Sequence, residues 1–134
     1  MAAWARAEEV VHTSTHAGSP LACAAAIATL DALRFRRLVV RARELGPTIL
    51  DCFRSELAGL RDVVEVRGVG LMIGIELASG AVGLRVSREM LARGYIVLTG
   101  GAKGEVLTLT PALNISEERL REAAAALREV LAAA

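Results

Sequence analysis

Apolar residues in the first half of the chain recur at helical spacing. Between residues 35 and 57 they fall every three or four positions with charged residues in the gaps, which predicts a helix with one buried face. Gly46-Pro47 interrupts this pattern. Because proline lacks an N–H donor and clashes with the preceding turn, we expect a kink or two abutting helices there. Gly59 is the expected C-terminal stop of this segment.

A second predicted helix precedes this one and has no polar face. Residues 21–33 are strong helix formers and almost entirely apolar, and Ser19 and Pro20 supply a cap and a first-turn proline. A helix that is apolar all round either packs on several sides or docks on something outside the chain. The polar stretch before it, residues 12–18, predicts a loop.

The second half of the chain mixes strand alternation with helical spacing. Apolar residues alternate with glycines and Glu76 between residues 62 and 78, which predicts two strands joined or bent at 67–70. The other predicted elements are a helix at 81–93 closed by Gly94, strands at 95–98 and 105–110 joined by a glycine-rich turn at 99–104, and a last helix capped by Ser116. This order predicts an α/β fold, with helices packed on a small mixed or antiparallel sheet.

Length and charge narrow the class of protein. A chain of 134 residues suits one domain with one core, and a formal net charge of +1 lacks the basic excess that binding to a nucleic-acid backbone needs. The longest apolar run, residues 21–30, is well short of the ~20 residues that span a bilayer. Glu8 and Glu9 stand where a signal peptide would carry basic residues. We therefore expect a cytoplasmic protein that binds neither nucleic acid nor membrane.

Two residue types limit the chemistry. Cys23 and Cys52 are too few for a disulfide scaffold and lie among apolar neighbours in predicted helices, so we expect buried free thiols in a reducing compartment. Lys103 is the only lysine, which leaves a single candidate for chemistry that needs a lysine amine.

Two glycine-rich segments are reminiscent of phosphate-binding motifs. Residues 68–74 follow a strand but read G-x-G-x-x-x-G, and the pattern after them is that of a strand where a phosphate-binding helix should begin. Residues 100–104 lie between two predicted strands with no helix behind them. We favour a bend or close strand packing for the first segment and a solvated hairpin turn for the second.

Side chains suited to metal binding or nucleophilic catalysis are sparse. His12 and His16 stand four residues apart and could join Cys23 around a zinc ion, but their surroundings are poor helix and no fourth ligand is near in sequence. Ser14 could pair with a histidine as a nucleophile, although no elbow or oxyanion motif accompanies it. We expect neither a metal site nor a serine nucleophile.

Three segments resemble one enzyme family in order and spacing. Residues 12–26, HTSTHAGSPLACAAA, are similar to the H-x-[ST]-T-[FY]-G-G-N-P-L-A-C-A-A-A segment of class III pyridoxal-phosphate aminotransferases, which include the acetylornithine, ornithine and 4-aminobutyrate enzymes. Residues 66–77 resemble the family's V-R-G-x-G-L-M-x-G-I-E-L, and residues 106–118 resemble its closing V-[LI]-x-[LF]-x-P-[PS]-L-x-I-[ST]-E-E. The resemblance covers the chain from Val10 onward.

The resemblance implies a particular part of such an enzyme. Residues 1–18 correspond to an interface and cofactor-phosphate loop at the end of the family's large domain, and residues 19–134 to the C-terminal small domain of the fold-type I architecture. The large domain precedes these segments in the family and carries the lysine that forms the Schiff base with pyridoxal 5'-phosphate. Lys103 lies in a predicted glycine-rich turn, where its amine is hydrated rather than desolvated. The resemblance therefore implies a fragment that is inactive alone.

The resemblance also assigns roles to three residues. By alignment, Ser14 and Thr15 supply the hydroxyls that bind the phosphate of pyridoxal phosphate in the neighbouring subunit of a homodimer. His16 and Ala17 depart from the family's aromatic residue and glycine beside these hydroxyls. Thr108 replaces an arginine that takes the substrate carboxylate in ornithine-type members. The substrate then either has no carboxylate at that end or is held by another residue, which favours amine or ω-amino donors.

Two functions are open from the sequence. One is a C-terminal fragment of a class III aminotransferase, whose partners are the missing large domain, a second subunit and a small-molecule amine. The other is a non-catalytic α/β module for dimerisation or regulation. An upstream reading frame that encodes the missing domain would distinguish them.

Overall fold

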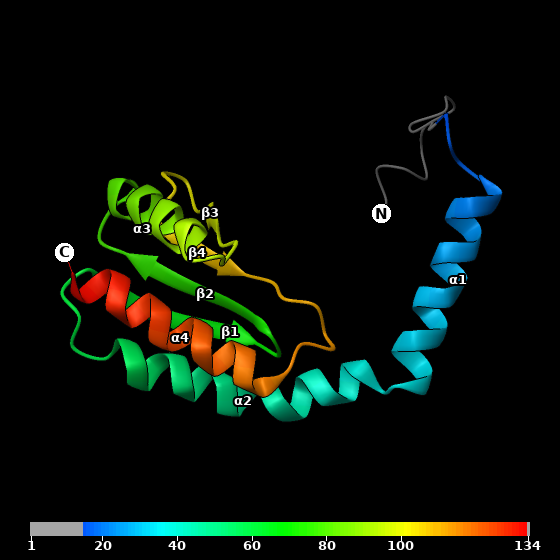
Figure 1. Cartoon of the computed structure of the whole chain (residues 1–134), viewed down its shortest axis with the longest axis horizontal. Helices are drawn as coiled ribbons and strands as arrows, with labels where there is room; N and C mark the ends of the chain where they lie inside the picture. The colour runs from blue at the N-terminus through cyan, green and yellow to red at the C-terminus, as the bar shows by residue number, and fades with distance from the viewer. Residues whose placement is uncertain (1–14, 134) are drawn as a thin grey trace, which may run out of the picture. The chain divides into compact units, whose positions relative to one another are not determined.

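The computed structural model describes residues 15–133, and contacts along the chain divide it into two compact units, Met1–Arg36 and Arg37–Ala134. The first unit contributes helix α1 (Pro20–Phe35). The second unit contains α2 (Leu38–Leu57), β1 (Val63–Val69), β2 (Met72–Leu77), α3 (Gly80–Ala92), β3 (Leu98–Gly100), β4 (Val106–Leu109) and α4 (Glu117–Ala132) (Figure 1).

The four strands form one antiparallel sheet in the order β1-β2-β4-β3. The predicted α/β class is confirmed, and of the two sheet types left open the antiparallel one is correct. The β1–β2 connection is a tight hairpin in which Gly70 has φ 58°, a left-handed conformation that glycine adopts without a Cβ clash. Residues 68–74 therefore form the turn of a β-hairpin and its flanking strand residues. This agrees with the predicted bend and not with a phosphate-binding loop. The segment after β3 likewise forms a hairpin turn into β4.

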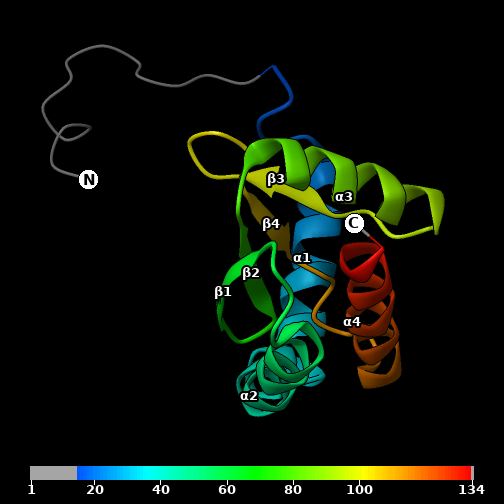
Figure 2. The ribbon, with the colours of Figure 1, turned by 90° about the vertical axis from the view of Figure 1, so that its left-hand side faces the viewer.

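The core lies on one face of this sheet, against helices α2, α3 and α4. Ile73, Ile75 and Leu107 point to that face and are at most 1% exposed. Phe53 of α2 and Val86 of α3 belong to the same core, and α4 packs beside both helices. Figure 2 shows α4 on one side of the sheet and α3 over β3. Because strand residues alternate between faces, the other half of the strand side chains point to a second face, which no helix of residues 37–133 covers.

Helix α2 runs unbroken through Pro47, so of the two alternatives predicted at Gly46-Pro47 the pair of abutting helices is wrong. Ala42 on one side of the proline and Ile49 and Phe53 on the other are buried on the same face of the helix. Continuous packing of that face outweighs the single backbone hydrogen bond that the proline removes.

The break between helices falls instead at Arg36 and Arg37. Arg37 has φ 50° and ψ 38°, a left-handed conformation that residues with a Cβ adopt at a cost, and it immediately precedes α2. At its other end α2 stops at Leu57, and Gly59 has φ 75°. The prediction of a glycine stop there is confirmed.

Strand β3 begins later than the sequence predicts. It comprises Leu98–Gly100 rather than residues 95–98, because the backbone N–H of Tyr95 donates to the Met90 carbonyl oxygen (2.9 Å) and ties the chain to the end of α3. The side chain of Val97 then turns into the core before the strand starts. Strand β4 lies within the predicted range.

Both later helices begin at a serine cap. The Ser116 hydroxyl accepts a hydrogen bond from the Arg119 N–H (3.3 Å), and α4 follows as predicted. The Ser79 hydroxyl accepts one from the Val82 N–H (3.4 Å) at the start of α3. Gly94, with φ 87°, follows the end of α3, as predicted.

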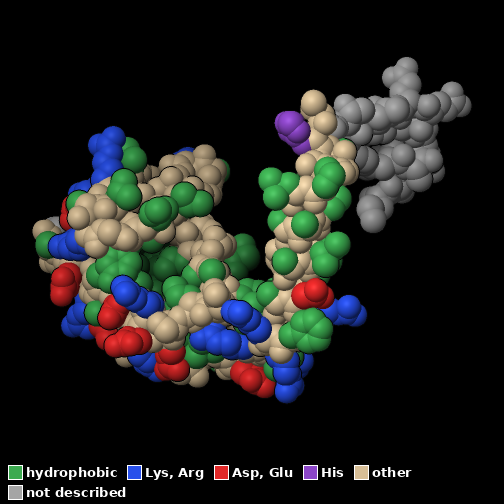
Figure 3. All heavy atoms as spheres, turned by 45° about the vertical axis from the view of Figure 1, so that its right-hand side comes forward, with side chains coloured by type: hydrophobic (Ala, Val, Ile, Leu, Met, Phe, Trp, Pro, Cys, Tyr) green, Lys and Arg blue, Asp and Glu red, His purple; other side chains and the backbone are tan. Residues whose placement is uncertain are grey.

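Helix α1 has no buried residue in the part of the chain that the structure describes. Leu21 and Phe35, near its two ends, are 82% and 83% exposed, and Figure 3 shows hydrophobic side chains along its length. Ser19 precedes the helix and Pro20 begins it, as predicted, but the serine side chain makes no capping hydrogen bond. No helix among residues 15–133 is both long and apolar enough to cross a bilayer.

The cysteines differ in burial. Cys23 on α1 is exposed, so the prediction of two buried thiols is wrong for this residue, because α1 buries no side chain within its own unit. Cys52 on α2 is half-buried and packs against the core. Both are free thiols, as predicted.

Candidate functional site

Thr108, the predicted substrate-binding residue, lies in the middle of the open face of the sheet, which we define as the face opposite α2, α3 and α4. On β4 it pairs with Gly74 of β2 on one side and with Leu98 of β3 on the other. Its neighbour Leu107 points into the core, so strand alternation turns Thr108 to the open face. The Thr108 hydroxyl lies on the β3 side of the residue. A Cβ built on Gly100 of β3 would be only 3.2 Å from Thr108 Oγ1.

A cavity of about 450 Å3 occupies this part of the open face. Residues of three strands line it, among them Arg67 of β1, Met72 and Gly74 of β2, and Val106 and Thr108 of β4. Its walls are mostly apolar, and its polar groups are the arginine guanidinium and the threonine hydroxyl. Such a mixture of apolar walls with a few polar groups is typical of sites for small organic molecules.

Two carboxylates hold the guanidinium of Arg67. Its Nη1 donates to Glu65 Oε2 (2.6 Å) and to Glu76 Oε2 (2.7 Å). The hydrogen bond with Glu76, followed by that with Glu65, raises the pKa of Arg67 above its usual range. The three groups together carry one net negative charge. The cluster therefore presents carboxylate oxygens to the open face together with the guanidinium nitrogens other than Nη1.

The predicted phosphate-binding hydroxyls belong to the first unit of the chain. Ser14 lies outside the described residues. Thr15 is exposed in a turn that leads into α1, in which the Ser19 N–H donates to the His16 carbonyl oxygen (3.1 Å) and Gly18 has φ 75°. A hydroxyl in an open turn just before a helix N-terminus is chemically able to donate to a phosphate.

Lys103 lacks the surroundings of an imine-forming lysine. It is exposed in the turn between β3 and β4, and its backbone N–H donates to Glu105 Oε2 (2.7 Å). Backbone N–H groups of Glu105, Lys103 and Ala102 hold the pKa of the Glu105 carboxyl below its usual range. A lysine amine that stays in water is a poor nucleophile. Lys103 is therefore not placed to form an imine.

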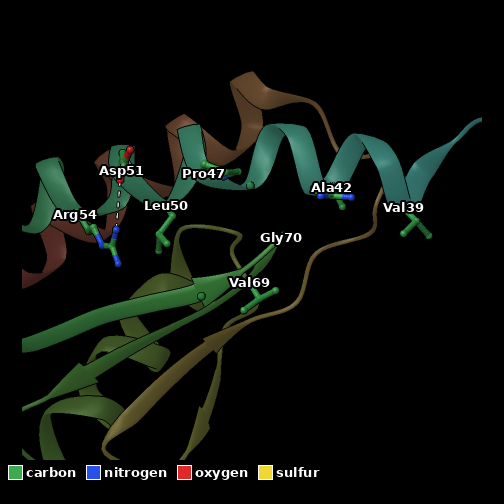
Figure 4. Close-up of a pocket in the computed structure, with 11 residues that line it drawn as sticks. Val39, Ala42, Pro47, Leu50, Asp51, Arg54, Val69 and Gly70 are labelled. Carbon is green, nitrogen blue, oxygen red and sulfur yellow. Dashed lines mark hydrogen bonds and ion pairs between the residues drawn. The ribbon is translucent and has the colours of Figure 1, made fainter.

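A second cavity, of about 520 Å3, lies between α2 and the β1–β2 hairpin (Figure 4). Val39 and Pro47 of α2 and Val69 of β1 contribute apolar walls. The Arg54 guanidinium and the Asp51 carboxylate, 3.4 Å apart, stand on the helix side. The charged groups of the cavity are this ion pair and Arg43, and no histidine, cysteine, serine or lysine lines it.

Histidine, cysteine and carboxylate side chains do not gather into a metal-binding set of three within residues 15–133. Of the residues that could have formed a zinc site, His12 lies outside the described part of the chain. His16 and Cys23 are exposed in the turn before α1 and on α1 itself.

Sequence reasoning identified Thr108 but missed its neighbours on the open face. Arg67, Gly74 and Glu76 lie in the two strands predicted within residues 62–78, and strand alternation alone puts the last two on one face. The pairing of β2 with β4 is what brings Gly74 opposite Thr108. Pairing between strands far apart in sequence leaves no local signal, so this relationship could not be predicted.

Comparison with known proteins points to one family. The family model described as "Aminotransferase class-III" matches residues 1–131. The chain is 41% identical over 107 residues to acetylornithine aminotransferase 1 of Bordetella parapertussis and 39% identical over 121 residues to the acetylornithine aminotransferase of Methanothermobacter thermautotrophicus. These alignments cover 80% and 90% of the chain, and 26% and 30% of the two relatives.

Several solved structures with the same fold are aminotransferases. A Bacillus anthracis aminotransferase superposes with a TM-score of 0.83 at 26% identity, over 96% of this chain and 32% of that one. An ornithine aminotransferase from Toxoplasma gondii superposes with a TM-score of 0.76 at 33% identity, over 91% of this chain and 29% of that one. The chain thus spans between a quarter and a third of the length of the proteins it matches.

Proposed function

Because the chain belongs to the class III aminotransferase family, we propose that it is the carboxy-terminal part of a pyridoxal-phosphate-dependent aminotransferase. Such an enzyme moves an amino group from an amine or ω-amino donor to a 2-oxo acid. The family match over residues 1–131 carries this proposal. Since the chain spans only 26–30% of its curated relatives, it acts together with the rest of such a polypeptide, in the cytoplasm.

The chain divides into two functional parts in this proposal. Residues 1–18 form the interface loop that reaches the cofactor phosphate, and residues 19–134 form the small domain. The antiparallel sheet and its three helices are the rigid body of that domain, which supports Thr108 on a central strand. A side chain on a paired central strand is positioned more precisely than one on a loop.

The cofactor is pyridoxal 5'-phosphate, bound at the interface of a homodimer. Ser14 and Thr15 donate to its phosphate from the neighbouring subunit, and the exposure of Thr15 in an open turn supports this role. The bound cofactor supplies an electron sink for amino-group transfer. The lysine that attaches it comes from the rest of the polypeptide, because Lys103, the only lysine here, is exposed in a hairpin turn.

The donor substrate carries an amine, and not a carboxylate, at the end that faces Thr108. A threonine offers one neutral hydroxyl, whereas an arginine at this position would offer two parallel charge-assisted hydrogen bonds to a carboxylate. Nη1 of the neighbouring Arg67 already donates to Glu65 and Glu76, which makes this guanidinium a weaker partner for a carboxylate than an uncommitted arginine. The net negative charge of that cluster favours an ammonium group over a carboxylate.

A chimeric enzyme tests the proposal. This chain replaces the matching part of acetylornithine aminotransferase 1 of Bordetella parapertussis, and the purified chimera is assayed for stoichiometric pyridoxal-phosphate binding and for amino-group transfer. We expect the chimera to bind pyridoxal phosphate stoichiometrically and to transfer amino groups. The isolated chain should show neither, and borohydride reduction in the presence of pyridoxal phosphate should leave no stoichiometric label on Lys103.

A pair of variants tests the phosphate role. Replacing Ser14 and Thr15 together by alanine removes two charge-assisted hydrogen bonds, so cofactor affinity in the chimera should fall by about tenfold or more. Ser19→Ala is the matched control, because the Ser19 side chain makes no capping hydrogen bond in the structure. A folded chimera that does not bind pyridoxal phosphate would contradict the proposal and favour the non-catalytic module.

A further inference from the structure

The segment between β4 and α4 has little regular structure of its own. Residues 110–116 join the end of β4 to the Ser116 cap of α4, and within them the Ile115 N–H donates to the Ala112 carbonyl oxygen (2.9 Å). Pro111 has no N–H to donate. Backbone of this kind keeps one conformation only where other groups of the protein hold it.

Arg41 of α2 holds this segment from a distant part of the sequence. Its Nη1 donates to the Leu113 carbonyl oxygen (2.8 Å) and its Nη2 donates to the Ile115 carbonyl oxygen (2.5 Å), across 72 and 74 residues of sequence. Arg41 is half-buried, and the next residue of the helix, Ala42, belongs to the core. Because the guanidinium is planar and binds two acceptors at once, it fixes both the position and the orientation of the backbone that carries them.

The guanidinium makes these hydrogen bonds although carboxylates are near. Glu44 and Glu117 line the same surface depression as Arg41. Arg41 nevertheless forms no ion pair within residues 15–133, and Glu117 Oε1 accepts from Arg121 Nη2 instead (2.6 Å). The charge of Arg41 is thus directed at main-chain carbonyl oxygens, where it strengthens both hydrogen bonds. Arg41 therefore fixes a backbone segment rather than balancing surface charge.

The held segment begins two residues after Thr108, where the sheet ends. Thr108 pairs with Leu98, the first residue of β3, so Leu109 has a strand partner on β2 alone. The ends of strands open more readily than their centres. The segment also lines a cavity of about 410 Å3 that Thr108 borders, to which Pro111 and Ile115 contribute. Loss of the anchor would therefore shift both Thr108 and the wall beside it.

We propose that Arg41 is a positioning residue of the aminotransferase, which fixes the exit of β4 and with it the direction of the Thr108 hydroxyl. The inference rests on the proposed function, in which Thr108 faces the donor substrate. Small displacements of a group that orients a substrate cost large factors in rate, so a contact remote from the substrate sets selectivity. Arg41 acts through Thr108 and touches no substrate itself.

A double-mutant cycle in the chimera with the Bordetella parapertussis enzyme tests this coupling. The donors are 1,4-diaminobutane and 1-aminobutane, which differ in the amino group at the end that faces Thr108, and selectivity is the ratio of their kcat/KM values. Arg41→Gln should lower the selectivity for the diamine by about tenfold, and by less than about twofold once Thr108→Val has removed the hydroxyl. Arg43→Gln is the matched control, because Arg43 is exposed on the same helix, and it should leave selectivity unchanged.

Two further measurements separate position from charge and from turnover. Arg41→Lys keeps the charge but replaces the planar fork by a flexible stem, so selectivity should fall nearly as far as with Arg41→Gln. In NMR spectra of the isolated chain, the Thr108 methyl signal should move or broaden for both Arg41 variants and stay in place for Arg43→Gln. The NMR signal needs neither cofactor nor activity.

Three results would overturn the inference. An equal loss of selectivity with and without Thr108→Val would show that Arg41 does not act through the Thr108 hydroxyl. A proportional loss for both donors would give Arg41 a merely structural role. An unchanged Thr108 signal in both Arg41 variants would show that the segment does not govern Thr108. A chimera that binds no cofactor would contradict the proposed function, while the NMR signal still decides whether Arg41 positions Thr108, so the two failures are distinguishable.

Discussion

Gly46 of α2 rests directly against Gly70 in the β1–β2 hairpin. A Cβ on Gly46 would lie 2.5 Å from the Gly70 carbonyl oxygen and 2.6 Å from its Cα. Gly46 is also buried, so the helix and the hairpin meet backbone to backbone at this point. The contact holds the middle of α2 against the β1–β2 hairpin, beside the cavity shown in Figure 4.

Gly46→Ala should destabilise the chain even though alanine is the better helix former. The helix-propensity gain is about 1 kcal/mol, whereas the overlap forces α2 and the hairpin apart at a cost of about 1–3 kcal/mol, and more where backbone must move. We expect a net loss of at least about 1 kcal/mol in the free energy of unfolding, measured by urea denaturation. Gly74→Ala is the control, because its Cβ has room. Equal effects of the two substitutions would show that the close contact with Gly70 is not what disfavours a side chain at Gly46.

Arg37→Gly should stabilise the chain. Arg37 holds a left-handed conformation with φ 50°, which costs a residue with a Cβ roughly 1–2 kcal/mol, while glycine adopts it freely. Since glycine also makes the unfolded chain more flexible, the net gain is about 0.5–1 kcal/mol by urea denaturation. Arg36→Gly is the matched control: its φ of −87° is ordinary, so the same change should destabilise. The prediction fails if both substitutions lower stability alike.

The Glu105 carboxylate should stabilise the β3–β4 hairpin in a pH-dependent way. Its pKa is lowered by backbone N–H groups, so its contribution is fully present above the ordinary value of 4.5 and is lost as the pH falls through the lower folded value. Glu105→Gln should therefore lower the thermal midpoint near neutral pH, and the difference from the unmodified chain should shrink below about pH 4.5. A constant difference across the acid range would contradict the assigned cause.

Thr108→Arg should change donor preference in the chimera. An arginine on this strand offers a carboxylate two charge-assisted hydrogen bonds, each worth roughly 1.5–3 kcal/mol where water is excluded. The ratio of kcat/KM for an α-carboxylate donor to that for a diamine should rise by on the order of a hundredfold. Thr110→Arg, at an exposed position beyond the end of β4, is the control and should leave the ratio unchanged. An unmoved ratio for Thr108→Arg would show that this residue does not face the substrate.

The isolated chain should self-associate through α1. Leu21, Ile27, Leu30 and Phe35 are all at least 59% exposed on this helix, and exposed apolar patches drive association. Sedimentation velocity should show larger species as concentration rises, and Ile27→Lys should reduce them. Val64→Lys, at a similarly exposed apolar position on β1, is the control and should change little. A monomer at all concentrations would contradict the prediction.

Local signals were enough for much of the secondary structure. Ser116 followed by two glutamates and an apolar stripe predicts α4 correctly, because a cap and a 3.6-residue period are properties of neighbouring residues. Gly59 and Gly94 mark the ends of α2 and α3 for the same reason. The segments 12–26, 66–77 and 106–118 pointed to the family that the family model confirms, because each is a run of neighbouring residues that can be compared directly.

Tertiary packing decided the features that local rules get wrong. Pro47 stays inside α2 because burial on one continuous face outweighs a lost hydrogen bond, and the break moves to Arg37. Strand β3 starts late because Tyr95 bonds back to the end of α3. The pairing of Gly74 with Thr108 joins residues 34 positions apart, and such pairings depend on free energies summed over the whole core rather than on neighbouring residues. The sequence by itself thus determined the helices, the turns and the family. The tertiary structure decided which face of the sheet is open and which residues, such as Gly74 and Thr108, lie side by side on it.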